Sequence, residues 1–418
     1  MDFPEGNGPL EGLRVVDMTT SYAGPTASMY LADLGAQVIK VERPGHGDDA
    51  RSWGPPFVEG TSAWFASANR NKRSVVLDLR ASGGREVLLR LLDVADVFLQ
   101  NMNPSKLEQL GIDGPALLRR NPGLIYCAMS GYGLDGPDSH LPGYDLVAQA
   151  RSGLMSVTGE KGGTPQRVST ALSDIATGMS AAIAISAAAV RQARSGVGEI
   201  IDVSLLDTDL ALMAPRIAAY HAGEPEPAPS GGTDSVLAVY QPFDAADRTI
   251  VVAIGNSLMW QRFCRATGLD ELAHEDALAD NAGRREHRER ITARVAAAIR
   301  RRSAAEWLRV LAEADVPAAL VQSLSEVVKD AQVTNRGSIM PVPDSNHALV
   351  SVRSPFRLAS GPAPRNERFP ALGEHTAEVL RELGYSPQAM AHLAATGAAE
   401  FGTAEPVRSG GEEGSLSA

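Results

Sequence analysis

The sequence predicts an α/β protein, with an open Rossmann-like parallel sheet as its large domain and a smaller α+β domain. Short apolar runs alternate with helical patterns over about the first 150 residues, as in repeated βαβ units. The Pro- and Gly-rich stretch "EPEPAPSGG" then interrupts this alternation. Beyond it the pattern changes to a β-hairpin followed by helices. The chain has 418 residues, which is long enough for two domains.

The first βαβ unit has the strongest local signals. "LRVVDM" predicts a buried strand over residues 13–18, and "QVIKVE" predicts a second strand over residues 37–42. The stretch "SYAGPTASMYLADLG" between them predicts a helix, with Pro25 suited to its first position and Gly35 to its end. Two strands joined by a helix imply a parallel pair with a right-handed crossover.

The same alternation predicts the rest of the large domain. The remaining strands are expected at "SVVLDL" (74–79), "VFLQN" (97–101), "LIYCAMS" (124–130) and "EIIDVSL" (199–205). Helices are expected at "REVLLRLLDVA" (85–95), from Pro104 onward, at "YDLVAQARSG" (144–153), from Asp174 onward, and at "DTDLALMAPRIAAYHAG" (207–223).

The smaller domain is expected to open with the hairpin "SVLAVYQPFDAADRTIVVAIG", whose turn is "DAADR". The Arg-rich stretch "RREHRERITARVAAAIRRRS" follows it. Its apolar residues Ile291, Val295 and Ile299 recur at helical spacing, so we interpret it as a solvated amphipathic helix. The formal net charge of -11 also argues against nucleic acid as a partner.

The ends and the apolar runs predict a cytoplasmic protein. The start "MDFPEGNGPLEGLR" lacks the basic and apolar regions of a secretory signal. The longest uncharged run, Ile175 to Val190, is short and Ala-rich, so we expect a buried core helix and no membrane partner. Cys127 and Cys264 lie in apolar surroundings and do not suggest a disulfide framework.

The stretch "VSTALSDIATGMSAAIAISAAAV" places one carboxylate, Asp174, at the head of that uncharged helix. As a structural residue, Asp174 would cap the helix or lie in its first turn, where the N–H groups and the helix dipole favour a carboxylate. As a functional residue, it would be a nucleophile or a base. This stretch alone leaves both interpretations open.

The turn of the first βαβ unit argues against NAD. Glu42 lies where a Rossmann fold binds the ribose, but the turn from Ser21 to Pro25 has one glycine and no GxGxxG. Basic residues follow the strands and could contact a different phosphorylated nucleotide, or could be ordinary surface residues. They are Arg43, Arg70, Lys72, Arg73 and Arg80.

With these features the chain resembles the family III CoA-transferases, which include formyl-CoA transferase, carnitine CoA-transferase and α-methylacyl-CoA racemase. The matching motifs run in order along nearly the whole chain: "LEGLRVVDMT", "GAQVIKVERPGHGD", "NRNKRSVVLDL", "PGYDLVAQARSGLMSVTG", "SDIATGMSAAIAI", "SEVVKDAQVTNRGSI" and "LGEHTAEVLRELG". The resemblance implies that Asp174 is the nucleophile, which carries CoA as an aspartyl thioester, and that Tyr144 is a second catalytic residue. The N–H groups at the helix start are expected to stabilise the oxyanion.

The resemblance also implies a CoA site, no metal, and no cofactor beyond CoA as a substrate. The expected CoA-binding residues are Ser21, Tyr22, Ala23, Arg43, Leu77, Arg80, Asn101, Met102, Asn103, Gly143 and Asp145. It further implies an interlocked homodimer. The expected division of each chain is a large domain (1–222), a small domain (223–330), a return segment completing the large domain (331–400) and a disordered tail (401–418).

Several features bear on the substrate. "GTDSVLAVYQPF" and "IVVAIGN" most resemble the succinyl-CoA:dicarboxylate branch, which implies succinyl-CoA as donor and a small carboxylic or dicarboxylic acid as acceptor. Gln109 replaces an Arg of several relatives, and "PSGGTD" is shorter than the glycine run of formyl-CoA transferases.

Tyr144 stands where the racemase branch has a His, which favours transfer because tyrosine is a poor base at neutral pH. His140, nearby in the sequence, could stand in for the missing base or be a surface residue. The alternatives are a 2-methylacyl-CoA racemase or epimerase, a CoA-ester dehydratase or lyase, and a non-catalytic acyl-CoA-binding protein.

Overall fold

The computed structural model describes residues 8–58, 60–343, 349–359 and 366–402. The chain divides into two compact units. The first unit combines the chain up to Ser152 with Ser169–Leu212 and the chain from Gly337 onward, and the second combines Gly153–Val168 with Met213–Arg336. Most of the expected tail (401–418) lies outside the described residues.

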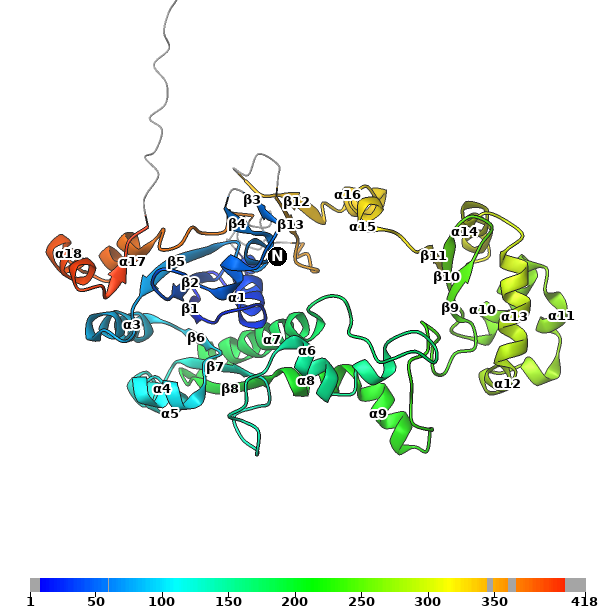
Figure 1. The fold of residues 1–418 in the computed structure, drawn as a ribbon, viewed down its shortest axis with the longest axis horizontal. Coiled ribbons are helices and arrows are strands. Elements are labelled where there is room, and N and C mark those ends of the chain that lie inside the picture. Colours follow the sequence, from blue (N-terminus) through cyan, green and yellow to red (C-terminus); the bar gives the residue numbers. More distant parts are fainter. Residues whose placement is uncertain (1–7, 59, 344–348, 360–365, 403–418) are drawn as a thin grey trace, which may run out of the picture. The chain divides into compact units, whose positions relative to one another are not determined.

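The first unit is built on a large, mainly parallel sheet (Figure 1), as predicted. In spatial order its strands, within the described residues, are β14 (Ala399–Glu400), β5 (Lys72–Leu77), β2 (Gln37–Glu42), β1 (Arg14–Met18), β6 (Val97–Gln100), β7 (Ile125–Ser130) and β8 (Glu199–Ser204). Only β14 pairs antiparallel among them. Because β2 and β5 lie on one side of β1 and β6 to β8 on the other, the strand order reverses at the β1–β6 pair.

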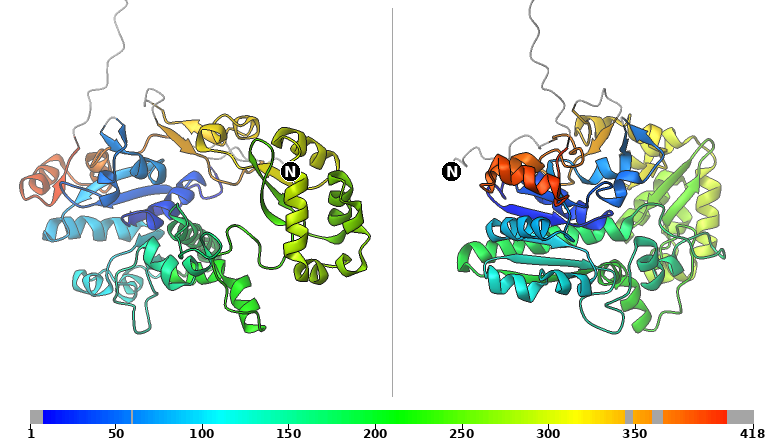
Figure 2. Two further views of the ribbon diagram at one scale, coloured as in Figure 1. Left: turned by 45° about the vertical axis from the view of Figure 1, so that its right-hand side comes forward. Right: turned by 60° about the vertical axis from the view of Figure 1, so that its left-hand side comes forward.

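Helices cover both faces of this sheet (Figures 1 and 2). One face packs on α1 (Ala23–Asp33) and α7 (Leu172–Ser195), and the other on α3 (Ser82–Val94), α5 (Gly114–Arg120) and α17 (Thr376–Glu382). Alternate strand residues divide between the two cores, with Val15 on the α1 and α7 side and Val16 on the opposite side. This alternation follows from the two-residue period of a strand.

Helix α7 is less buried than its sequence suggests. It packs along α1 and against β7 and β8, but Met179, Ile183 and Val190 on its other face are exposed, Ile183 by 71%. Of the described helices, α7 alone is long and apolar enough to cross a membrane by length and composition. Its contacts with the sheet make it a helix of the α/β unit.

The first unit contains further elements around this framework. They are η1 (Asp49–Ser52), β3 (Phe57–Val58), β4 (Thr61–Ser62), α2 (Ala63–Ala68), α4 (Pro104–Leu110), α6 (Asp145–Arg151), α8 (Leu205–Leu212), β12 (Ile339–Pro341), β13 (Val350–Val352) and α18 (Pro387–Ala395).

The second unit carries a small antiparallel sheet of β9 (Tyr240–Asp244), β10 (Thr249–Ala253) and β11 (Ala318–Leu320), which includes the predicted hairpin. Its remaining elements are η2 (Met155–Val157), α9 (Ala214–His221), α10 (Ser257–Thr267), α11 (Asp270–Ala273), η3 (Asp276–Leu278), α12 (Asn281–Glu286), α13 (Arg288–Ile299), α14 (Ala304–Glu313), α15 (Leu324–Val327) and α16 (Ala331–Asn335).

Two predicted helices are each interrupted in the structure. The helix expected over residues 207–223 is α8 followed by α9, and the break precedes Pro215, which cannot donate a backbone hydrogen bond. The Arg-rich helix is α12 followed by α13, which meet at His287. The apolar face predicted for it is confirmed, because Ile291, Val295 and Ile299 are fully buried.

Candidate active site

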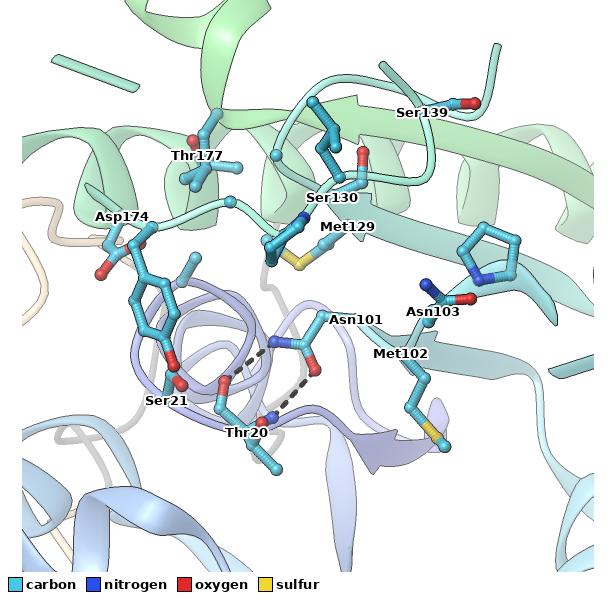
Figure 3. Close-up of a pocket in the computed structure, with 18 of the residues that line it drawn as sticks. Thr20, Ser21, Asn101, Met102, Asn103, Met129, Ser130, Ser139, Asp174 and Thr177 are labelled. Carbon is cyan, nitrogen blue, oxygen red and sulfur yellow. Dashed lines mark hydrogen bonds between the residues drawn. The ribbon is translucent and has the colours of Figure 1, made fainter. Parts of the chain in front are cut away.

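A cavity of about 460 Å³ opens at the carboxyl ends of β1, β6 and β7 (Figure 3). This edge is where open α/β sheets bind ligands, beside the point of strand reversal. The β1–α1 turn, the chain after β6, the loop before α6 and the first turns of α7 form its wall. Asp174 and Tyr144 both line it, so the structure brings the two predicted catalytic residues together.

The β1–α1 turn is tied to the end of β6 across the reversal point. Thr20 N donates to Asn101 Oδ1 at 3.1 Å, and Asn101 Nδ2 donates to Thr20 O at 2.9 Å, as Figure 3 shows. The loop before α6 is held closely to the end of β7. A Cβ on Gly143 would lie 2.3 Å from Gly131 Cα, so only glycine fits there.

Asp145, and not Asp174, supplies the carboxylate that satisfies the start of α7. Asp174 is the third residue of the helix. Asp145 Oδ1 accepts from Ser173 N at 2.8 Å and from Asp174 N at 3.4 Å. The helix-cap interpretation of Asp174 is therefore wrong, although its first-turn position is confirmed. These two N–H groups already have an acceptor in this structure, Asp174 N at the longer distance, which argues against the oxyanion role expected for them.

Three carboxylates gather at this helix start. Asp209, fully buried on α8, accepts from Ser173 Oγ at 2.8 Å through Oδ2. Burial, followed by the charges of Asp145 and Asp209, raises the pKa of Asp174 to about 7. A carboxyl group with this pKa is about half ionised at neutral pH and more basic than an ordinary aspartate, as is typical of functional carboxylates.

A second cavity of about 910 Å³ adjoins the first, and the two share Thr20 and the chain from Asn101 to Asn103. Its wall carries four basic side chains, those of Arg43, His46, Arg80 and Lys106. Arg43 is paired with Asp49, and Arg80 with Asp78 at 2.8 Å.

Glu42 also lies on this wall, but its carboxylate is already engaged. Arg51 donates to it at 2.7 and 2.8 Å, Ser74 Oγ at 2.6 Å and Asp48 N at 2.9 Å. It is therefore part of a hydrogen-bond network rather than a free acceptor for a ribose.

The predicted CoA-binding residues divide between the two cavities. The smaller cavity is lined by Ser21, Ala23, Asn101, Met102, Asn103 and Gly143, and the larger by Arg43, Leu77, Arg80 and again Asn101, Met102 and Asn103. Tyr22 and Asp145 line neither cavity. The Tyr22 hydroxyl lies 2.9 Å from Ser67 Oγ. The Asp145 carboxylate accepts from Ser173 N at the start of α7 and, at 2.7 Å, from Gln149 Nε2.

Sequence reasoning did not single out Thr177, Lys106 and His46, which line these cavities. It also missed Asp209, which lines neither cavity but binds Ser173 beside Asp174. Lys106 and His46 could have been found by their positions after predicted strands, but nothing local in the sequence distinguishes Asp209 from a surface carboxylate. His140 lines the smaller cavity. Within the described ranges, no group of three or more His, Cys, Asp or Glu side chains could hold a metal ion.

Comparison with known proteins identifies the family of the chain. The family model described as CoA-transferase family III matches residues 10–376. A succinyl-CoA:glutarate CoA-transferase of Mus musculus is 37% identical over 401 residues, which cover 94% of this chain and 90% of that protein. A succinate–glutarate CoA-transferase of Agrobacterium fabrum is 36% identical over 389 residues, covering 91% and 97%. The crystal structure of a CAIB/BAIF family protein from Brucella suis is similar with a TM-score of 0.79 and 36% identity, covering 90% of this chain and 100% of that one. The protein is therefore a CoA-transferase and belongs to CoA-transferase family III.

Proposed function

We propose that the protein moves CoA from succinyl-CoA to a small carboxylic or dicarboxylic acid through an aspartyl-CoA thioester on Asp174. The observation that carries the proposal is the place of Asp174. This carboxylate, with a pKa of about 7, lies on the wall of one cavity that adjoins a larger one whose wall includes Arg43, Arg80 and Lys106. Two relatives are named for succinyl-CoA or succinate together with glutarate. Glutarate is therefore the first acceptor to test.

The reaction follows from the chemistry of a carboxylate nucleophile. One oxygen of ionised Asp174 attacks the thioester carbonyl. The C–S bond then breaks, CoA leaves as a thiolate, and the acyl group remains on Asp174 as a mixed anhydride. The thiolate attacks the aspartyl carbonyl, which releases the first acid as its carboxylate and leaves CoA on Asp174. The acceptor carboxylate then attacks the aspartyl thioester, which gives a new mixed anhydride and free CoA thiolate. The thiolate attacks the acceptor's acyl carbonyl, which forms the new acyl-CoA and releases Asp174 as its carboxylate. No net proton is gained or lost.

The chain's own groups have distinct parts in this scheme. The first cavity holds the thioester and the acid beside Asp174, and the second holds the phosphorylated end of CoA near Arg43, Arg80 and Lys106. Since Asp145 occupies the N–H groups of Ser173 and Asp174, we assign the oxyanion donor to the Tyr144 hydroxyl on the same wall. Orientation contributes most, because effective molarities reach ~10⁵–10⁸ M.

We also propose the interlocked homodimer and the large-domain, small-domain and return-segment organisation. Exposed apolar side chains on α6, α7 and α8 support a covered surface on the first unit. They are Leu146, Val147, Met179, Ile183, Val190, Leu210 and Leu212. Light scattering should give a dimer mass, and a stable monomer with full activity would exclude the interlocked form.

A trapping experiment tests the proposed function. Incubation with succinyl-CoA followed by borohydride or hydroxylamine should modify Asp174 in the parent protein, and Asp174→Asn should show no adduct and no transfer to glutarate. Transfer that persists in Asp174→Asn would refute the mechanism. Exchange of solvent deuterium at the acyl α-carbon without CoA transfer would instead identify the racemase alternative, for which His140 lines the same cavity.

A further inference from the structure

The turn between β1 and α1 contains one residue in an unfavourable backbone conformation. Ser21 has a φ of 72°, in the left-handed region that residues other than glycine rarely adopt. Such a conformation persists only where surrounding contacts impose it. Ser21 lines the cavity of Asp174, so the contacts that impose its conformation bear on the reaction.

The carboxylate of Asp48 makes the contact that fixes Ser21. Asp48 Oδ1 accepts from Ser21 N and from Ala50 N, each at 2.9 Å. Its other oxygen lies 2.8 Å from Lys40 Nζ, and both side chains are 0% exposed. Lys40 Nζ also donates to Thr19 O at 2.8 Å, so this ion pair touches the turn at two points.

Lys40 keeps its charge although its side chain is fully buried. Burial lowers the pKa of Lys40, but the charges of Asp48, Asp17 and Glu42 outweigh burial and hold this pKa above its usual value. Replacing a buried ion pair with apolar residues is often neutral or stabilising, so stability alone does not explain why one is present. A fixed conformation is the better-supported role, because breaking the pair would release the turn.

The turn is part of both cavities. Thr19 and Asp48 lie on the wall of the larger cavity, Thr20 on both walls, and Ser21 on the wall of the smaller one beside Asp174. A displacement of Ser21 would therefore change the space in which a bound thioester meets the nucleophile. The opposite side of the turn is fixed by Asn101, so Asp48 is the remaining anchor of Ser21.

We propose that Asp48, backed by Lys40, is a positioning residue for CoA transfer, because it holds Ser21 in its left-handed conformation and so keeps the thioester aligned with Asp174. The inference rests on the proposed function for its catalytic consequence. The conformational part, that Asp48 holds the turn, stands by itself.

The test is a double-mutant cycle between Asp48→Ala and Ser21→Gly. Glycine adopts positive φ without steric cost, so it needs no anchor to reach the conformation of Ser21. We expect Asp48→Ala to lower kcat for transfer from succinyl-CoA to glutarate at least tenfold in the parent protein, with a smaller change in KM. In the Ser21→Gly background the same substitution should lower kcat less than threefold.

Two further variants separate positioning from stability. Asp48→Asn keeps an oxygen that can accept from Ser21 N but loses the charge that pairs with Lys40, so its kcat should lie between those of the parent protein and of Asp48→Ala. Asp33, the last residue of α1, forms a buried ion pair with Arg70 at 2.5 Å. Asp33→Asn removes the charge of this pair at the end of α1 that is far from Ser21. It should lower the melting temperature and leave kcat unchanged. Equal losses of kcat for Asp48→Ala in both backgrounds would overturn the proposal.

Amide hydrogen exchange measures how firmly the β1–α1 turn is held, independently of catalysis. In Asp48→Ala the Ser21 amide should exchange at least tenfold faster, while amides in the second unit should not change. An unchanged Ser21 exchange rate would refute the positioning role whatever the enzyme assays show. If the exchange result is as expected but the parent protein transfers no CoA, the proposed function fails and the structural role of Asp48 remains.

Discussion

The raised pKa of Asp174 predicts that this carboxylate, the proposed nucleophile, destabilises the fold when it is ionised, and that Asp174→Asn removes this cost. The folded-state pKa of about 7 lies above the usual 3.8, so the folded protein prefers the protonated form. The cost of ionisation is absent below the unfolded-state pKa, grows as pH rises between the two values, and is constant above the folded one. At ~1.36 kcal/mol per pKa unit, it reaches at most about 4 kcal/mol at pH 8.

Asparagine has nearly the same shape and no charge, and no hydrogen bond to the Asp174 carboxylate is found among the described residues. The gain in the free energy of unfolding for Asp174→Asn should therefore be about 2–3 kcal/mol larger at pH 8 than at pH 5, by the same linkage. Urea unfolding at the two pH values measures it. Asp93→Asn is the control, because Arg120 holds the pKa of Asp93 below its usual value. Its ionised form stabilises the fold at both pH values, so this substitution should lower the free energy of unfolding by the same amount at pH 5 and pH 8. A gain of equal size at both pH values, or no gain at all, would refute the reasoning.

Three other predictions follow from the site. Asp209→Asn removes one of the charges that raise the pKa of Asp174. In the pH profile of kcat/KM for transfer, the fall in rate on the acid side, expected near pH 7, should therefore move to lower pH. An unchanged profile would contradict this. Lys106→Ala should raise KM for succinyl-CoA about tenfold at constant kcat, since Lys106 lines the larger cavity and has no ion pair in the described part of the chain; an unchanged KM excludes a phosphate contact. Gly178→Ala should lower the free energy of unfolding by about 1–3 kcal/mol, because its Cβ would lie 2.7 Å from Ala23 O; a melting temperature equal to that of the parent would show that α1 and α7 can separate.

The alternation of apolar runs and helical patterns was enough to predict the parallel strands of the main sheet, because most of these strands are buried on both faces. The edge strand β14 was not predicted, since its two residues have no such pattern. The run "SVVLDL" predicted β5 two residues too far along, since Lys72 is fully buried and its ion pair with Asp17 has no apolar signature. The break between α8 and α9 could have been predicted from Pro215. The break at His287 has no such local cause.

The site was predictable where its chemistry is local and not where it depends on tertiary contacts. Asp78 and Asp49 lie two and six residues from the arginines they pair with, so the partners of Arg80 and Arg43 could have been foreseen. Asp145 reaches the start of α7 from 29 residues upstream. No sequence spacing distinguishes that contact from many others of the same length.

The small helix-dipole energy and the large pKa shift together explain why the start of α7 needs two aspartates. A carboxylate in the first turn of a helix gains only about 0.3–1 kcal/mol from the dipole, and much of the favourable hydrogen bonding at α7 already goes to Asp145. Asp174 is left beside a like charge in a partly buried position, where burial and its neighbours raise its pKa to about 7. One aspartate thus stabilises the helix, while the other, the proposed nucleophile, remains more basic than an ordinary aspartate. A protein that used a single carboxylate for both tasks would have to lower the pKa of its nucleophile.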